Sequence, residues 1–135
     1  MMAMHFSGVW SYRSLINEPD LLVPFDSLRF GAGTLNLTEP ESGKVAGSLG
    51  GSGWSLSLLG AATDGDPPTL RWQGRGVISG EEWIYDYLGY LIPDWPDGVA
   101  QIDTIVGTII RTVPHSNGQA LAGHTATFYA VRVSA

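Results

Sequence analysis

Turn-forming residues divide this chain into eight short runs with strand-like composition, and no run between them has the length and period of a helix. Gly50-Gly51-Ser52-Gly53 and Ser79-Gly80 predict tight hairpin turns. The predicted strands cover approximately residues 5–13, 28–37, 44–49, 54–59, 69–78, 82–92, 101–113 and 123–133. Strands that follow one another through short turns pair antiparallel.

Eight such strands in chain order favour an all-β fold, an eight-stranded antiparallel up-and-down β-barrel, because closure pairs both edge strands. A two-sheet β-sandwich is the alternative, but its Greek-key connections need long crossovers that this chain lacks. The sequence has 135 residues and no cysteine. We therefore predict that residues 1–135 form a single domain whose core needs no disulfide.

Composition restricts the classes of partner. The net charge of −6 argues against nucleic acid and against an anionic membrane surface. Only 15% of the residues are charged, which suggests that another subunit covers part of the outer surface. The seventh predicted strand supports a homodimer or homotetramer, because it is apolar on both faces. Its apolar residues are Ile102, Val106 and Ile110 on one face and Ile105 and Ile109 on the other.

The chain start shows no signal-peptide pattern, and no apolar run approaches the roughly 20 residues that span a bilayer. We therefore expect a cytoplasmic protein. Three scattered histidines give no ligand spacing for a metal, and no glycine-rich loop opens a helix to hold a phosphate. We expect neither a metal nor a cofactor.

Two short elements suggest a family. Gly8-x-Trp10 on the first predicted strand and Arg132 on the last resemble the signature of the calycin superfamily, which includes the lipocalins, fatty-acid-binding proteins and avidins. The resemblance implies that Arg132 packs across the buried Trp10 ring near one end of the barrel. A guanidinium stacks well on an indole face. The polar residues with which avidins hold biotin have no match here.

Topology predicts which end of the barrel opens. Gly8, Trp10 and Arg132 belong near the end that carries both termini, so the opposite end should be the mouth. The apolar connection over residues 14–27 lies there and is expected to act as a lid. Strand alternation brings aromatic and polar side chains together below it. The predicted ligand-binding residues are Tyr12, Trp83, Tyr85, Tyr87, Arg111, His124 and Phe128, with His115 at the rim.

These residues support two functions. The first is a barrel that binds a hydrophobic or amphipathic metabolite. The alternative is a small barrel enzyme that carries out acid–base, isomerisation or cyclisation chemistry on such a molecule. Candidate catalytic residues are Tyr85, Asp86, His115 and His124. For Asp86, two other interpretations are that it faces solvent or pairs with Arg75. A purely structural barrel, filled by its own side chains, is a third possibility.

Overall fold

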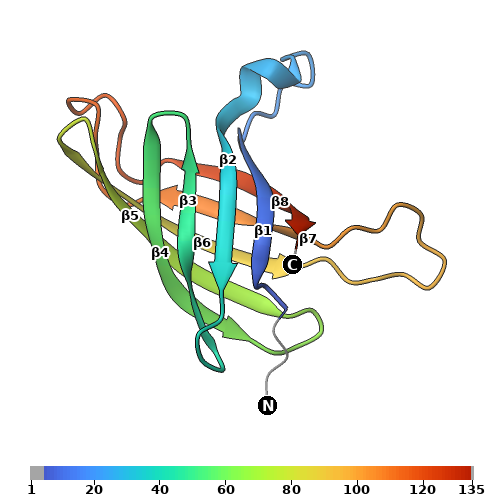
Figure 1. The fold of residues 1–135 in the computed structure, drawn as a ribbon. Helices are drawn as coiled ribbons and strands as arrows, with labels where there is room; N and C mark the ends of the chain where they lie inside the picture. Colours follow the sequence, from blue (N-terminus) through green and yellow to red (C-terminus); the bar gives the residue numbers. More distant parts are fainter. Residues whose placement is uncertain (1–4, 135) are drawn as a thin grey trace.

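The computed structural model describes residues 5–134, which form one closed antiparallel barrel in the order β1-β2-β3-β4-β5-β6-β7-β8 (Figure 1). The prediction of an eight-stranded up-and-down barrel is confirmed, and the sandwich is not observed. The strands are β1 (Gly8–Ile16), β2 (Arg29–Thr38), β3 (Lys44–Gly51), β4 (Trp54–Thr63), β5 (Thr69–Ile78), β6 (Glu81–Leu91), β7 (Thr104–Arg111) and β8 (Thr125–Ser134). A short 3₁₀ helix, η1 (Phe25–Leu28), precedes β2.

The two shortest hairpins lie where the turn residues predicted them. Ser79 and Gly80 connect β5 to β6 with φ angles of 52° and 79°, the left-handed pair that a two-residue hairpin needs. Gly53, with φ of 80°, performs the same task between β3 and β4. These turns keep neighbouring strands in register, so the inward faces of β5 and β6 align at Trp72 and Tyr87.

Alternation along each strand fills the barrel with one face of the sheet. On β1 the buried residues are Trp10, Tyr12 and Ser14. In the middle of the barrel Tyr12 stacks on Phe128, with the ring centroids 5.5 Å apart. Trp72 stacks on Tyr87 at 4.8 Å. A continuous aromatic core therefore crosses from β1 and β8 to β5 and β6.

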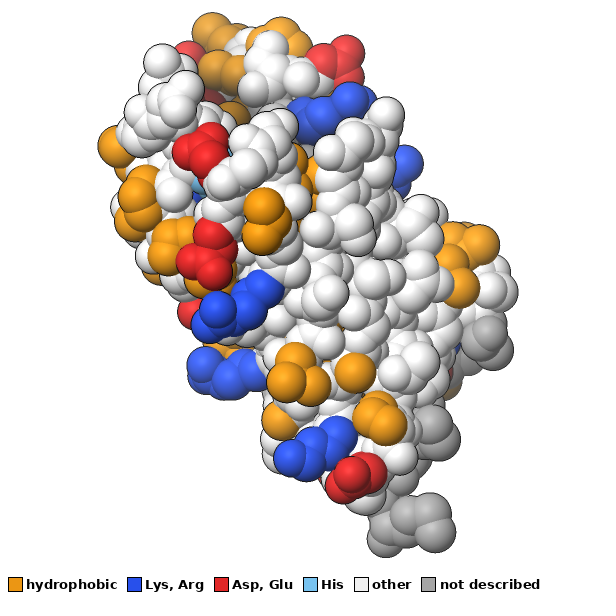
Figure 2. Space-filling model, turned by 60° about the vertical axis from the view of Figure 1, so that its left-hand side comes forward, with side chains coloured by type: hydrophobic (Ala, Val, Ile, Leu, Met, Phe, Trp, Pro, Cys, Tyr) orange, Lys and Arg blue, Asp and Glu red, His pale blue; other side chains and the backbone are white. Residues whose placement is uncertain are grey.

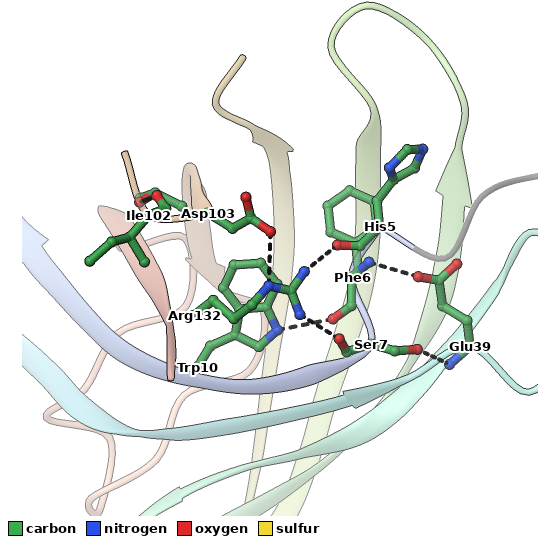
Figure 3. Close-up of polar contacts among 9 residues, drawn as sticks. His5, Phe6, Ser7, Trp10, Glu39, Ile102, Asp103 and Arg132 are labelled. Atoms are coloured by element: carbon green, nitrogen blue, oxygen red, sulfur yellow. Dashed lines mark hydrogen bonds and ion pairs between the residues drawn. The ribbon is translucent and has the colours of Figure 1, made fainter. Parts of the chain in front are cut away.

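The end of the barrel near both termini is closed by Arg132 and Trp10 (Figure 3). Trp10 is fully buried, and the Arg132 guanidinium carbon lies 4.3 Å from its ring centroid. The guanidinium donates hydrogen bonds to the carbonyl oxygens of His5 and Ser7 and to the Asp103 carboxylate. Both the burial of Trp10 and its contact with Arg132 agree with the sequence prediction.

Backbone groups ahead of β1 complete this closed end. The indole Nε1 of Trp10 donates to the Phe6 carbonyl oxygen at 2.9 Å. The Phe6 amide donates to the Glu39 carboxylate at 2.8 Å, and the Glu39 amide donates to the Ser7 hydroxyl. Glu39 is thus a buried acid that anchors residues outside the strand ladder. This network holds residues 5–7 against the end of the barrel although they form no strand.

The connection between β1 and β2 does not cover the mouth, so the expectation of a lid is wrong. It projects away from the barrel together with η1 (Figure 1). Leu21 and Leu22 are 97% and 90% exposed, and Phe25 is 83% exposed. The loop is held mainly by its own turns, in which the Val23 amide donates to the Asp20 carbonyl oxygen. Its apolar side chains therefore lack the packing surface that the sequence interpretation assigned to them.

The outer surface mixes apolar and charged side chains. Figure 2 shows one face on which hydrophobic side chains lie in separate groups among basic and acidic side chains. Among residues 5–134, no helix has both the length and the hydropathy needed to cross a membrane.

Candidate ligand cavity

A cavity of about 200 Å³ lies at the barrel end opposite the Trp10–Arg132 closure. Residues near the C-terminal ends of β1 and β7 and near the N-terminal ends of β2, β4 and β6 surround it. Antiparallel pairing brings these strand ends together at one end of the barrel. The lining residues are Tyr12, Ser14, Phe30, Gly31, Trp54, Leu56, Trp83, Tyr85, Tyr87 and Ile109. Six of these ten are aromatic, so the cavity has large, flat and mostly apolar walls.

One polar group of the wall, the Tyr85 hydroxyl, belongs to a hydrogen-bonded set. Arg111 lies opposite Tyr85 in the β6–β7 ladder, and its Nε donates to the hydroxyl oxygen at 3.1 Å. The same oxygen lies 2.7 Å from Nε2 of His115. A guanidinium can only donate, so Tyr85 accepts from Arg111. The direction of the contact with His115 is set by the imidazole tautomer, and with the ring proton on Nδ1 the Tyr85 hydroxyl donates to Nε2. Nε2 of His115 is then the acceptor.

His115 is held from every side. Its ring stacks on the Trp83 indole with the centroids 3.9 Å apart and 12° between the planes. Nδ1 lies 2.9 Å from the Ser116 hydroxyl, which accepts the ring proton in that same tautomer. The Glu81 carboxylate accepts hydrogen bonds from the amides of Ser116 and Asn117 and so fixes the loop. His115 is only 5% exposed, although it follows a proline in a loop.

This environment favours the neutral imidazole. Burial lowers the pKa of His115 below its usual value, and the Arg111 charge lowers it further. The Glu81 carboxylate raises this pKa and offsets part of the effect. The lowered pKa favours the uncharged ring at neutral pH. The Nδ1 tautomer is the one that gives both the Tyr85 proton and the ring proton an acceptor.

The phenols deeper in the cavity stay protonated. Burial raises the pKa of both Tyr12 and Tyr87 well above the ordinary value for tyrosine. Among the described residues, the Tyr12 hydroxyl and the Trp83 Nε1 are buried and have no hydrogen-bond partner. This wall is neutral, and it suits an apolar molecule better than an ion.

The structure brings some predicted residues to the cavity and places others elsewhere. Tyr12, Trp83, Tyr85 and Tyr87 line it. Arg111 lies behind Tyr85, and its guanidinium carbon is 5.6 Å from the Tyr85 ring centroid. Their role in binding stays a prediction.

The other predicted residues lie outside the lining. Phe128 is buried below the cavity, stacked on Tyr12. His124 is exposed and stacks on Phe30, with the centroids 5.2 Å apart. Asp86 faces outward and accepts a hydrogen bond from Gln73, and Gln73 in turn accepts one from Arg75. His115 is buried against Trp83 instead of forming the rim.

Six of the ten lining residues were not predicted from the sequence. Phe30, Trp54, Leu56 and Ile109 line the cavity but were not predicted site residues. Alternation along β2 and β4, counted from the predicted mouth, was the signal that could have found Phe30 and Trp54. Ser14 was treated as the start of a loop, although β1 continues to Ile16.

Comparisons with protein-family models, with curated protein sequences and with solved structures find no match to this chain. Within residues 5–134, no three His, Asp or Glu side chains cluster as ligands for a metal ion.

Proposed function

We propose that the protein binds a small apolar or amphipathic molecule in the cavity at the open end of its barrel. The observation that carries this proposal is that aromatic side chains surround an unfilled space instead of closing on one another. Eight-stranded barrels are narrow enough to be filled by their own side chains. A space at one end, beside a packed core at the other, therefore supports a binding role for the open end and a structural role for the closed end. Rings such as Phe30, Trp54 and Tyr87 offer contact area to a flat or branched ligand.

The polar part of such a ligand would face Tyr85 and Arg111. The Arg111 side chain crosses the Phe30 ring, with its guanidinium carbon 5.2 Å from that centroid, and so remains beside the mouth. A carbonyl or carboxylate oxygen at this place would receive a charge-assisted hydrogen bond. The combination of an apolar body and one directing cation supports an amphipathic ligand over a purely hydrocarbon one.

We also propose that this barrel is a calycin-like one, related to the lipocalin and avidin group. The support is the contact that the resemblance implied, Arg132 across the buried Trp10 ring at the closed end. The ligand cavity at the opposite end fits that arrangement. The cytoplasmic location likewise stays a prediction from the sequence.

Quenching of intrinsic Trp fluorescence tests the binding proposal, because Trp54 and Trp83 line the cavity. A panel of apolar carboxylates, ketones and phenols should include compounds that bind with dissociation constants well below millimolar. Ile109→Phe fills the space from an inward-facing position and should weaken the bound compounds. Val77→Phe is the matched control, since Val77 is 75% exposed on the outer face. If the panel shows no binding, or if both variants act alike, the cavity is not a ligand site.

We further propose that the outer faces of β6 and β7 pair with a second copy of this chain. Leu88 and Tyr90 on β6 are partly exposed, and Tyr90 lies opposite Val106 in the ladder. Ile110 on β7 extends the same outward apolar strip. Apolar side chains on two paired strands form a self-complementary surface of the kind found in isologous contacts. Sedimentation should show a dimer or tetramer, and Tyr90→Lys should shift it to monomer; a wild-type monomer at micromolar concentration would exclude the contact.

A further inference from the structure

We propose that Tyr85, with His115 and Arg111 behind it, is an acid–base site that removes a proton from a carbon acid bound in the cavity. This inference rests on the proposed function, because it requires a ligand against the Tyr85 side of the wall. It assigns a reaction to the barrel, namely proton abstraction next to an electron-withdrawing group. Tyr85 is the catalytic residue, while His115 and Arg111 are positioning residues that act through its hydroxyl.

The direction of the hydrogen bonds carries the argument. Tyr85 accepts from Nε of Arg111 at 3.1 Å, and its hydroxyl lies 2.7 Å from Nε2 of His115, to which it donates in the tautomer with the ring proton on Nδ1. A neutral imidazole that accepts the phenolic hydrogen bond can take that proton as the phenolic oxygen receives one from the ligand. A guanidinium that donates to this oxygen stabilises the negative charge that builds on it during the transfer. One lone pair of that oxygen remains, and Tyr85 is the member of the set that lines the cavity.

The set also connects the cavity to solvent. His115 is buried, but the Ser116 hydroxyl that accepts its Nδ1 proton belongs to an exposed residue. A proton that enters at Nε2 can therefore leave from Nδ1 without opening the barrel. Two charged groups face this imidazole. Arg111 opposes its protonation from the Tyr85 side, and Glu81 favours it from the loop side.

The proposed step balances without any further reagent. The ligand C–H proton passes to the Tyr85 oxygen as the phenolic proton passes to Nε2 of His115, which becomes an imidazolium. The electron pair of the broken C–H bond stays on the ligand as an enolate or expels a leaving group. Loss of the Nδ1 proton through Ser116 to water makes His115 neutral in the other tautomer. Once the product has left, the Nε2 proton passes back to Tyr85 as Tyr85 gives a proton to water in the cavity, and Nδ1 takes up a proton through Ser116, which restores the starting state.

A nitrobenzisoxazole is a suitable probe because it is small, flat and aromatic. Removal of its one acidic C–H proton breaks the ring N–O bond and gives a coloured cyanophenolate. Wild-type protein should accelerate this opening. The rate should rise with pH and level off with an apparent pKa below the usual histidine value, because burial and Arg111 lower the pKa of His115. Tyr85→Phe and His115→Gln should each lose about 10-fold or more of the protein-dependent rate.

His5→Gln is the matched control for His115→Gln. His5 lies at the closed end beside Asp64, remote from the cavity, and its loss should leave the rate unchanged. Thermal melts and Trp emission should show that all three variants are folded. The ¹⁵N shifts of the His115 ring give a readout independent of any ligand: wild type should carry its proton on Nδ1. A proton found on Nε2 at neutral pH would overturn the proposal.

The outcomes separate this inference from the binding proposal. If the probe binds, as Trp quenching reports, but the rate does not depend on Tyr85 and His115, the acid–base site is refuted and the binding cavity stands. If neither the probe nor the panel of carboxylates, ketones and phenols binds, both proposals fall. Binding together with a Tyr85-dependent and His115-dependent rate supports both.

Discussion

Replacing Arg132 by alanine should destabilise the barrel strongly, because its side chain, together with Trp10, closes the barrel end near both termini. The Arg132 guanidinium donates to the carbonyl oxygens of His5 and Ser7 at 2.6 Å each. It also donates to Asp103 at 2.9 Å and covers the Trp10 ring at 4.3 Å. Arg132 thus connects the residues ahead of β1 to Asp103 and to Trp10 (Figure 3).

The magnitude follows from those contacts. Hydrogen bonds from a charged donor contribute about 1.5 kcal/mol each, and water compensates part of this because the two carbonyl groups belong to partly exposed residues. The cation–π contact contributes about 1 kcal/mol, since the guanidinium is mostly buried. Asp103 is 43% exposed, so its ion pair contributes below about 1 kcal/mol. The expected loss for Arg132→Ala is about 3 kcal/mol.

Urea unfolding followed by Trp fluorescence measures this loss. With a slope of about 2 kcal/mol/M, the midpoint should fall by about 1.5 M. Asp103→Ala is the control variant and should lower the free energy of unfolding by less than about 1 kcal/mol, because only the exposed ion pair is lost. Arg132→Ala with a loss below about 0.5 kcal/mol would show that the closed end does not depend on this residue, and the reasoning would be wrong.

Three further predictions concern the open end. The pKa of His115 is lowered in the folded protein, so below the usual histidine pKa the unfolded chain binds more protons than the folded one. The free energy of unfolding should therefore fall in mildly acidic buffer, and it should fall less in His115→Gln than in wild type. Urea titrations at neutral and mildly acidic pH measure this difference. Glu81→Ala should free the amides of Ser116 and Asn117, seen as faster amide exchange there than in wild type. Leu22→Ser should change stability by less than about 0.5 kcal/mol in thermal melts, and a larger loss would mean that the loop does pack.

Much of the fold followed from the turn residues. Strand positions were predicted to within a few residues because Gly, Pro and Asn clusters interrupt an otherwise apolar chain, and short turns leave antiparallel pairing as the simple solution. Alternation then decided that Tyr12, Tyr85 and Tyr87 point inward. These conclusions needed only local rules, which is why no contact information was required for them.

The tertiary structure decided what local rules could not. His115 follows a proline in a loop, and only the approach of that loop to β6 places its ring on Trp83 and its Nε2 beside Tyr85. The connection over residues 14–27 was expected to be a lid, but Leu21, Leu22 and Phe25 are exposed instead of packing over the mouth. The alternation of inward and outward side chains depends on residues that are neighbours in the chain, so it can be predicted from the sequence. The path of a loop depends on contacts between residues far apart in the chain, which only the closed barrel brings together.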